Sequence, residues 1–198
     1  RAVTPLEASE KKIIKLCKQS RKEGFELLFK KFENYIYKIC YSYTYSKEDA
    51  LDIMQEVFFK IYKSFESFDG KKALSPWVKR ITVNTCLNYT RDNSKRCGDV
   101  SINRSIDDEK NTFEDIIADG CNTEDRAIYM DTKKLLENSI KELPKEVRMA
   151  IILKHLQGLS YEKVAQIMNC PEGTVKTYVF RGRKLLKDRL VKKGVWEV

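Results

Sequence analysis

Hydrophobic positions recur at three- and four-residue spacing through most of the chain, which is the pattern of amphipathic α-helices. In the first half, two such repeats run from Phe25 to Phe32 and from Ile36 to Tyr43. A third helix is predicted over 47–64, with a polar face opposite its apolar one. A further helix is predicted from Ser75-Pro76 to about residue 92, because serine is favoured as an N-cap and proline in the first helical turn. No strand-like alternation persists, so this half is predicted to be all-α.

The second half shows the same helical periodicity. Gly158 is expected to end a helix, and Ser160 to cap the next one. The four predicted helices cover residues 124–141, 145–157, 160–168 and 171–190.

Between the two halves lies a stretch rich in Asn, Asp, Ser, Thr and Gly that lacks sustained helical periodicity. The fold class predicted is therefore all-α, with two small helical domains joined by an acidic linker and a helix-turn-helix in the second. Apolar residues between 11 and 16 also predict a short helix near the N-terminus. The predicted segments are an N-terminal extension (1–21), a first helical domain (22–96), the linker (97–123), a second helical domain (124–193) and a C-terminal tail (194–198).

Charge is abundant and unevenly spread along the 198 residues. Lys and Arg total 38 against 29 Asp and Glu, a net charge of +9, whereas residues 97–130 hold nine acids and three bases. A basic excess favours a polyanionic partner, nucleic acid before membrane, since no apolar run of about 18 residues accompanies it. The N-terminal residues also lack the apolar core of a signal peptide, so a cytoplasmic location is expected.

The six cysteines lie far apart, form no C-x-x-C pair, and are accompanied by a single histidine. This pattern argues against a zinc finger and favours reduced thiols, several of them in the core. No metal site, cofactor or small-molecule substrate is predicted.

The strongest local pattern is the run from Gly158 to Lys176, which has the layout of a helix-turn-helix: a short helix, a tight turn, and a longer basic helix. On the last helix Val175, Val179 and Gly182 share one face with Leu186, and polar or basic residues occupy the other. An apolar stripe would fix the helix to its scaffold, while the outer face offers donors to bases and phosphates. A solvated basic helix in a bundle is the alternative, but with the preceding helix and turn DNA binding is favoured.

The run from Gly158 to Arg183, preceded by Leu143-Pro144, resembles region four of bacterial RNA polymerase sigma factors. The stretches Asp49–Phe58 and Trp77–Asn84 resemble region two of the same family. With only an acidic linker between them, the chain is similar to the compact extracytoplasmic-function (ECF) subgroup. Two independent motifs in the family's order carry more weight than a single helix-turn-helix.

The resemblance implies three sets of functional residues. In the family, the polar side of the third region-two helix binds the β′ clamp of core polymerase, which here implies Asp49, Asp52, Gln55 and Glu56. Reading and melting of the −10 element imply Phe68, Asp69, Lys71, Arg80, Asn84, Asn88 and Arg91. Recognition of the −35 element implies Thr174, Lys176, Thr177, Phe180, Arg181, Arg183 and Lys184.

The function that the resemblance implies is that of a non-catalytic specificity subunit. Such a protein binds core RNA polymerase at the β′ clamp and the β flap, directs it to −10 and −35 promoter DNA, and initiates transcription. Family members are usually held inactive by an anti-sigma factor, often a membrane-bound one. A stand-alone helix-turn-helix repressor or activator is the alternative. An enzyme acting on nucleic acid is disfavoured, because no metal-ligand cluster or paired carboxylates are evident.

Overall fold

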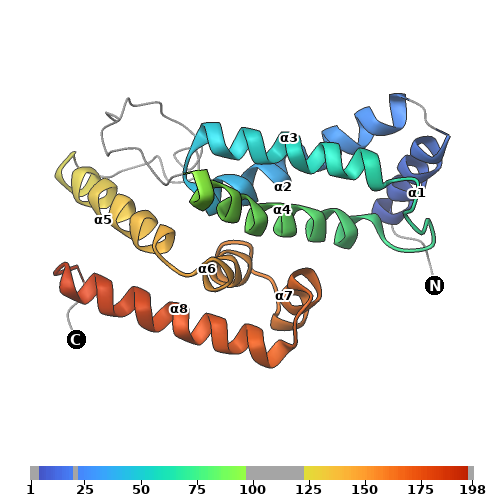
Figure 1. Cartoon of the computed structure of the whole chain (residues 1–198). Helices are drawn as coiled ribbons and strands as arrows, with labels where there is room; N and C mark the ends of the chain where they lie inside the picture. The colour runs from blue at the N-terminus through green and yellow to red at the C-terminus, as the bar shows by residue number, and fades with distance from the viewer. Residues whose placement is uncertain (1–4, 20–21, 97–122, 196–198) are drawn as a thin grey trace.

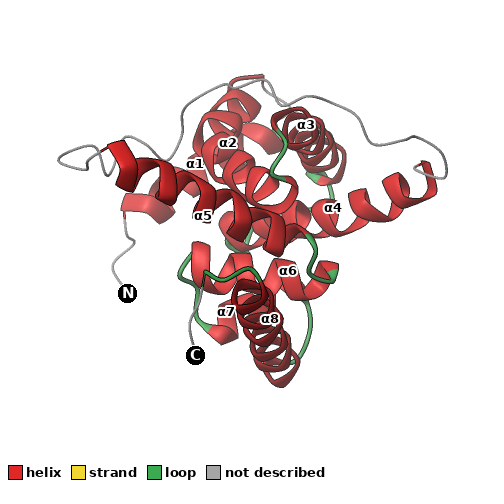
Figure 2. Ribbon diagram, turned by 90° about the vertical axis from the view of Figure 1, so that its left-hand side faces the viewer, coloured by secondary structure: helices red, strands yellow, loops and turns green. Residues whose placement is uncertain are grey.

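A computed structural model of the chain describes residues 5–19, 22–96 and 123–195, and all regular elements in this part are helical (Figures 1 and 2). The predicted linker lies almost entirely outside the described residues. The elements, in order, are α1 (Pro5–Lys18), α2 (Lys22–Thr44), α3 (Lys47–Ser64), α4 (Leu74–Arg96), α5 (Thr123–Lys141), α6 (Lys145–Ile151), the π-helical turn η2 (Ile152–Leu156), α7 (Tyr161–Met168) and α8 (Glu172–Lys192).

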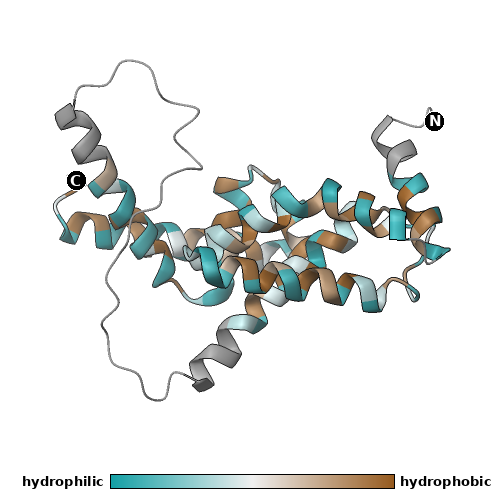
Figure 3. Cartoon of the chain, turned by 90° about the horizontal axis from the view of Figure 1, so that it is seen from above, coloured by the Kyte–Doolittle hydropathy of each residue, from teal (hydrophilic) through white to brown (hydrophobic). Residues whose placement is uncertain are grey.

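In the N-terminal half, α2, α3 and α4 pack on one another and α1 packs on α2 (Figure 1). The apolar positions that predicted the helices are the ones that lie inside, among them Ile36, Ile53, Val57 and Val78, all fully buried. Figure 3 shows the pattern along the ribbon, where apolar and polar segments alternate within each helix. The amphipathic pattern therefore sets the packing of this half.

In the C-terminal half, α8 is the long helix on which α5, α6 and α7 pack. Its stripe of Val175, Val179 and Gly182 is buried, as the spacing predicts. Gly182 lets α6 approach closely, because a Cβ at this position would lie 2.6 Å from Ile151 Cγ1. The stripe thereby leaves the opposite side of α8 to solvent.

The two halves also contact each other, through α4 against α6 and α7 and through α2 against η2. Arg148 of α6 is the polar centre of this junction. Its Nη1 donates to the Tyr43 carbonyl at 3.2 Å and its Nη2 to the carbonyls of Lys141 and Leu143, with the guanidinium carbon 5.0 Å from the Tyr43 ring centre. Burial lowers the pKa of Arg148. One side chain thus joins the ends of α2 and α5 to α6.

Several helix boundaries differ from the sequence prediction. The repeats over 25–32 and 36–43 belong to one continuous helix, α2, and α4 runs to Arg96 rather than to about residue 92. The helix expected at Ser75 begins at Leu74, and the helix expected over 145–157 changes after Ile151 into a π-helical turn, closed by the bond from Gln157 N–H to the Ile152 carbonyl. Gly158 follows with a φ of +64° and ends that helix, as predicted. Residues 5–18 form α1, a longer helix than the short one expected there.

Candidate nucleic-acid and polymerase interface

The side of α8 opposite its buried stripe carries the side chains predicted to read DNA. Phe180 is 71% exposed, the largest exposed fraction among the large hydrophobic residues of the described chain. The basic residues around it are also exposed. Thr174, in the first turn of α8, is half-buried and so is less exposed than they are. The exposed members of the predicted set are Lys176, Thr177, Phe180, Arg181, Arg183 and Lys184.

Local sequence explains why α8 is presented in this way. The Ser160 hydroxyl accepts the Lys163 N–H and caps α7, as predicted. Asn169 ends α7 in the left-handed conformation, a role that asparagine tolerates better than most residues. Pro171 then precedes α8, whose first turn receives no side-chain cap. A helix, a tight turn and the start of a second helix therefore follow one another with few residues between them.

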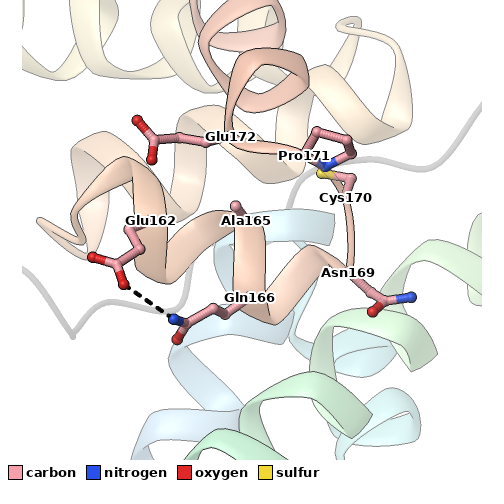
Figure 4. Close-up of a pocket in the computed structure, with 7 residues that line it drawn as sticks. All are labelled: Glu162, Ala165, Gln166, Asn169, Cys170, Pro171 and Glu172. Carbon is pink, nitrogen blue, oxygen red and sulfur yellow. Dashed lines mark hydrogen bonds between the residues drawn. The ribbon is translucent and has the colours of Figure 1, made fainter.

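An open hollow of about 390 Å³ lies beside this turn (Figure 4). The carboxylates of Glu162 and Glu172 stand at its rim, and Gln166 Nε2 donates to Glu162 at 3.3 Å. Acids at this rim disfavour phosphates there, so anion binding is expected further along α8. The hollow is lined by Glu162, Ala165, Gln166, Asn169, Cys170, Pro171 and Glu172.

Two of the bases on α8 have protein partners. Lys176 Nζ lies 2.7 Å from Glu172, and the hydrogen bond between them raises the pKa of the lysine. Arg189 donates to the Ser139 carbonyl at 2.7 Å and pairs with Glu142, so it anchors α8 to the end of α5. Helical spacing is the signal that separates it from Arg181, because Arg189 follows Gly182 by seven residues and so lies on the buried side of α8.

The predicted polymerase-binding residues lie on α3. Asp52, Gln55 and Glu56 are exposed, and Glu56 pairs with Lys60 one turn along at 2.5 Å. Asp49 is different, because it is half-buried and accepts the Tyr89 hydroxyl at 2.8 Å. Asp49 therefore ties α3 to α4, while the other three residues face solvent.

The predicted −10 residues fall into two groups, the first of which lies in the α3–α4 loop. Phe68 is only 5% exposed and packs against Trp77 with ring centres 4.6 Å apart, so it does not provide the open aromatic surface expected for replacing base stacking. Its packing against Phe65 completes this burial. Asp69 shapes the loop, since its Oδ1 accepts the Lys71 N–H at 3.0 Å, and the Lys71 side chain is exposed.

The second group lies along α4. Arg80, Asn84 and Asn88 are exposed at four-residue spacing and form one stripe. Arg91 lies further along the same helix, but its side chain is outside the described residues. The stripe and Lys71 are the polar part of the predicted −10 surface.

Among the residues that the structure describes, no three His, Cys, Asp or Glu side chains gather as metal ligands. In the same part of the chain, Cys17, Cys40, Cys86 and Cys170 form no disulfide. None of the described helices combines the length and apolar character that a membrane span requires.

Two family models match the chain. Sigma-70 region 2 matches residues 28–96, which include α3 and α4, and Sigma-70 region 4 matches residues 133–186, which include the helix-turn-helix. Each candidate surface thus lies inside a region of the sigma-70 class of RNA polymerase sigma factors.

Curated relatives place the chain more closely. It is 32% identical over 182 residues to the ECF RNA polymerase sigma-E factor of Haemophilus influenzae, covering 92% of this chain and 95% of the relative. It is 30% identical over 178 residues to the protein of the same name in Escherichia coli K12, covering 90% and 92%. The chain therefore belongs to the ECF sigma factors. A stand-alone helix-turn-helix regulator is accordingly set aside.

Two solved structures share the fold. One is CnrH in complex with the cytosolic domain of CnrY, with a TM-score of 0.63, 16% identity, and coverage of 93% of this chain and 98% of that one. The other is the sigma factor RpoE in complex with the anti-sigma factor NepR from Bartonella quintana, with a TM-score of 0.61, 21% identity, and coverage of 84% and 96%. Over most of its length, this chain thus has the fold of two proteins that were solved with partner proteins.

Proposed function

We propose that this ECF sigma factor binds core RNA polymerase through the exposed side of α3, contacts −10 DNA with the α3–α4 loop and α4, and contacts −35 DNA with α8. It acts by binding and positioning, in the cytoplasm where the polymerase works, and carries out no chemical step itself. The observation that carries this proposal is the division of α8 into a fully buried apolar stripe and an opposite side with Phe180 and exposed bases.

Chemistry supports separate roles for the α3 and α8 surfaces. On α3, Asp52 and Glu56 place carboxylates on an exposed face, which suits a basic protein partner and repels DNA. On α8, Arg181, Arg183 and Lys184 present cations that suit phosphates. Thr177 presents a hydroxyl. Lys176 lies next to Glu172, so DNA would compete with that carboxylate for it.

The −10 contact rests on fewer side chains. Arg80, Asn84 and Asn88 offer donors and acceptors to an exposed base edge, and Lys71 offers a cation to the backbone. Phe68 contributes indirectly, by packing under the loop with Phe65 and Trp77.

We also propose that an anti-sigma factor controls the protein. Support comes from the two similar folds, which were solved in complexes with the cytosolic domain of CnrY and with the anti-sigma factor NepR. We propose a membrane-bound partner for this chain, because the part of CnrY in the first complex is named as a cytosolic domain. Such a partner would cover the α3 or α8 surface and so prevent polymerase or promoter binding.

The first test is binding of bacterial core polymerase to the purified chain, followed by transcription from promoters selected out of a random DNA library. The double variant Asp52→Ala with Glu56→Ala is expected to weaken polymerase binding at least about tenfold, since two charged contacts are removed. Glu23→Ala, which removes an exposed acid from the first turn of α2, is the matched control. Normal polymerase binding by the double variant would place the polymerase contact elsewhere. Tight duplex binding without polymerase would contradict the proposed function.

A further inference from the structure

Helix α1 lies outside the match to sigma-70 region 2, which begins at residue 28. Nevertheless α1 runs along the end of the N-terminal half where the α3–α4 loop and the start of α4 are found (Figure 1). It is fixed there by its own core residues, with Ile13, Ile14 and Cys17 all buried. Gly24 brings α2 into close contact with α1, because a Cβ on Gly24 would lie 2.5 Å from the Cys17 backbone nitrogen. The position of α1 relative to the bundle is therefore tightly defined.

Glu10 of α1 reaches the first turn of α4. Its side chain is buried, the whole residue being 8% exposed, and its Oε2 accepts the Leu74 N–H at 3.1 Å. Its Oε1 accepts the Ser75 hydroxyl and lies 3.6 Å from Lys31 Nζ of α2. The first N–H groups of a helix have no partner within it, and a carboxylate near them is favoured by the helix dipole. Glu10 thus caps α4 from 64 residues away, in the place where the sequence predicted Ser75 as the cap.

The loop before α4 also contacts α1. A Cβ on Gly70 would lie 3.2 Å from the Lys18 side chain and 3.4 Å from Ile14, so the loop passes close to the last turns of α1. The loop is further closed by Asp69, whose carbonyl accepts the Lys72 N–H at 2.9 Å. Both ends of the segment from 69 to 75 are therefore held, one by α1 packing and the other by the Glu10 carboxylate.

We propose that α1 positions the −10 reading surface of this sigma factor, with Glu10 as the positioning residue that sets the start of α4 and the path of the α3–α4 loop. Glu10 contacts no DNA in this scheme and acts through Leu74 and Ser75. The inference rests on the proposed function, because it assumes that Lys71 and the exposed polar stripe of α4 contact −10 DNA. A change in the first turn of α4 would alter the direction in which that stripe and loop meet the DNA.

The test uses the full chain reconstituted with core polymerase, on promoters that the wild-type holoenzyme has selected from a random library. Glu10→Ala is expected to lower the fraction of promoter melted at −10, measured by permanganate reactivity of unpaired thymines, by about fivefold, as expected for loss of one helix-capping group. Glu10→Gln keeps an oxygen acceptor for Leu74 and is expected to recover most of the melting. Polymerase affinity and binding to a duplex that carries only the −35 element are expected to stay unchanged.

Glu26→Ala is the matched control, because Glu26 is an exposed carboxylate that pairs with a lysine of its own helix. Thermal unfolding identifies loss of fold, and if Glu10→Ala does not fold, Ser75→Ala removes one donor to the same carboxylate and is expected to lower melting about twofold. Melting by Glu10→Ala equal to that by Glu26→Ala, or an equal loss at −10 and −35, would overturn the inference while the proposed function stands. A wild-type chain that opens no promoter would instead overturn the proposed function.

Discussion

Helices α4 and α8 present the two predicted DNA surfaces, but contacts of very different range hold them. The start of α8 is set by residues next to it in the chain, through the Ser160 cap and the left-handed Asn169. The start of α4 depends on Glu10, 64 residues earlier and on another helix. A helix-turn-helix thus carries its geometry in local signals, whereas the predicted −10 surface depends on a helix outside the region 2 match.

The largest expected loss of stability is at two glycines, one in each half, where another helix approaches most closely. Gly24→Ala is expected to destabilise the protein by about 3 kcal/mol, because its Cβ would overlap the backbone of α1. Gly182→Ala is expected to destabilise it by about 1–2 kcal/mol, because its Cβ would meet the side chains of Ile151 and Val147, which can shift more readily than the backbone of a helix. Urea unfolding monitored by circular dichroism measures both changes.

Gly173→Ala is the control for these two substitutions, since nothing lies within 4 Å of the added Cβ. It is expected to leave stability unchanged or raise it by up to about 1 kcal/mol through helix propensity. Equal stability of all three variants would show that neither approach is tight.

The junction between the halves offers the next test. Arg148→Met removes every hydrogen bond from the guanidinium to the carbonyls of Tyr43, Lys141 and Leu143 while keeping an apolar side chain. We expect a loss of about 2 kcal/mol, since these are hydrogen bonds from a charged donor. Hydrogen exchange should also speed up at the end of α2. Lys187→Met, at an exposed position of α8, is the control. An equal loss of stability in the two variants would show that the Arg148 hydrogen bonds do not hold the halves together.

On α8, Arg181 is proposed to contact DNA, whereas Arg189 holds the helix to α5. Arg181→Ala is expected to weaken promoter binding about tenfold and to reduce the slope of log affinity against log salt by about 0.9 for each phosphate that is no longer neutralised. Arg189→Ala should instead lower the unfolding temperature and leave that slope unchanged, because Arg189 bonds to α5. Filter binding of holoenzyme across a salt series gives both slopes, and identical slopes would place Arg181 away from phosphates.

The two halves also differ in how their stability depends on high pH. Burial raises the pKa of the Cys17 thiol from 9.0 to about 11, so between these values the folded chain keeps a proton that the unfolded chain has lost. The unfolded state then binds fewer protons, and stability falls as pH rises from about 9 to about 11. Cys17→Ala should flatten this fall in a series of urea titrations. Cys170→Ala, in the turn before α8, should change the fall in stability less, because that thiol is only half-buried. A larger change for Cys170→Ala than for Cys17→Ala would contradict this explanation by burial.

Much of the helical layout could be predicted from the sequence. Residues 47–64 form α3 with the predicted bounds, and Ser160 and Gly158 act as the cap and the stop that their residue types indicate. The exposed side of α8 was predictable for the same reason, because a stripe at helical spacing defines the opposite face. The π-helical turn after Ile151 was not, since it depends on how that helix meets its neighbours.

Periodicity and capping residues were enough to specify most of the helices, their buried faces and the outward position of Phe180 and the bases around it. All of these signals lie within a few positions of one another in the chain. Four other features emerged from the packing of distant elements: the burial of Phe68, the bond from Tyr89 to Asp49, the anchoring of α5 by Arg189, and the capping of α4 by Glu10. Spacing along one helix could not reveal them, because the burial and partners of a side chain depend on which elements meet in space.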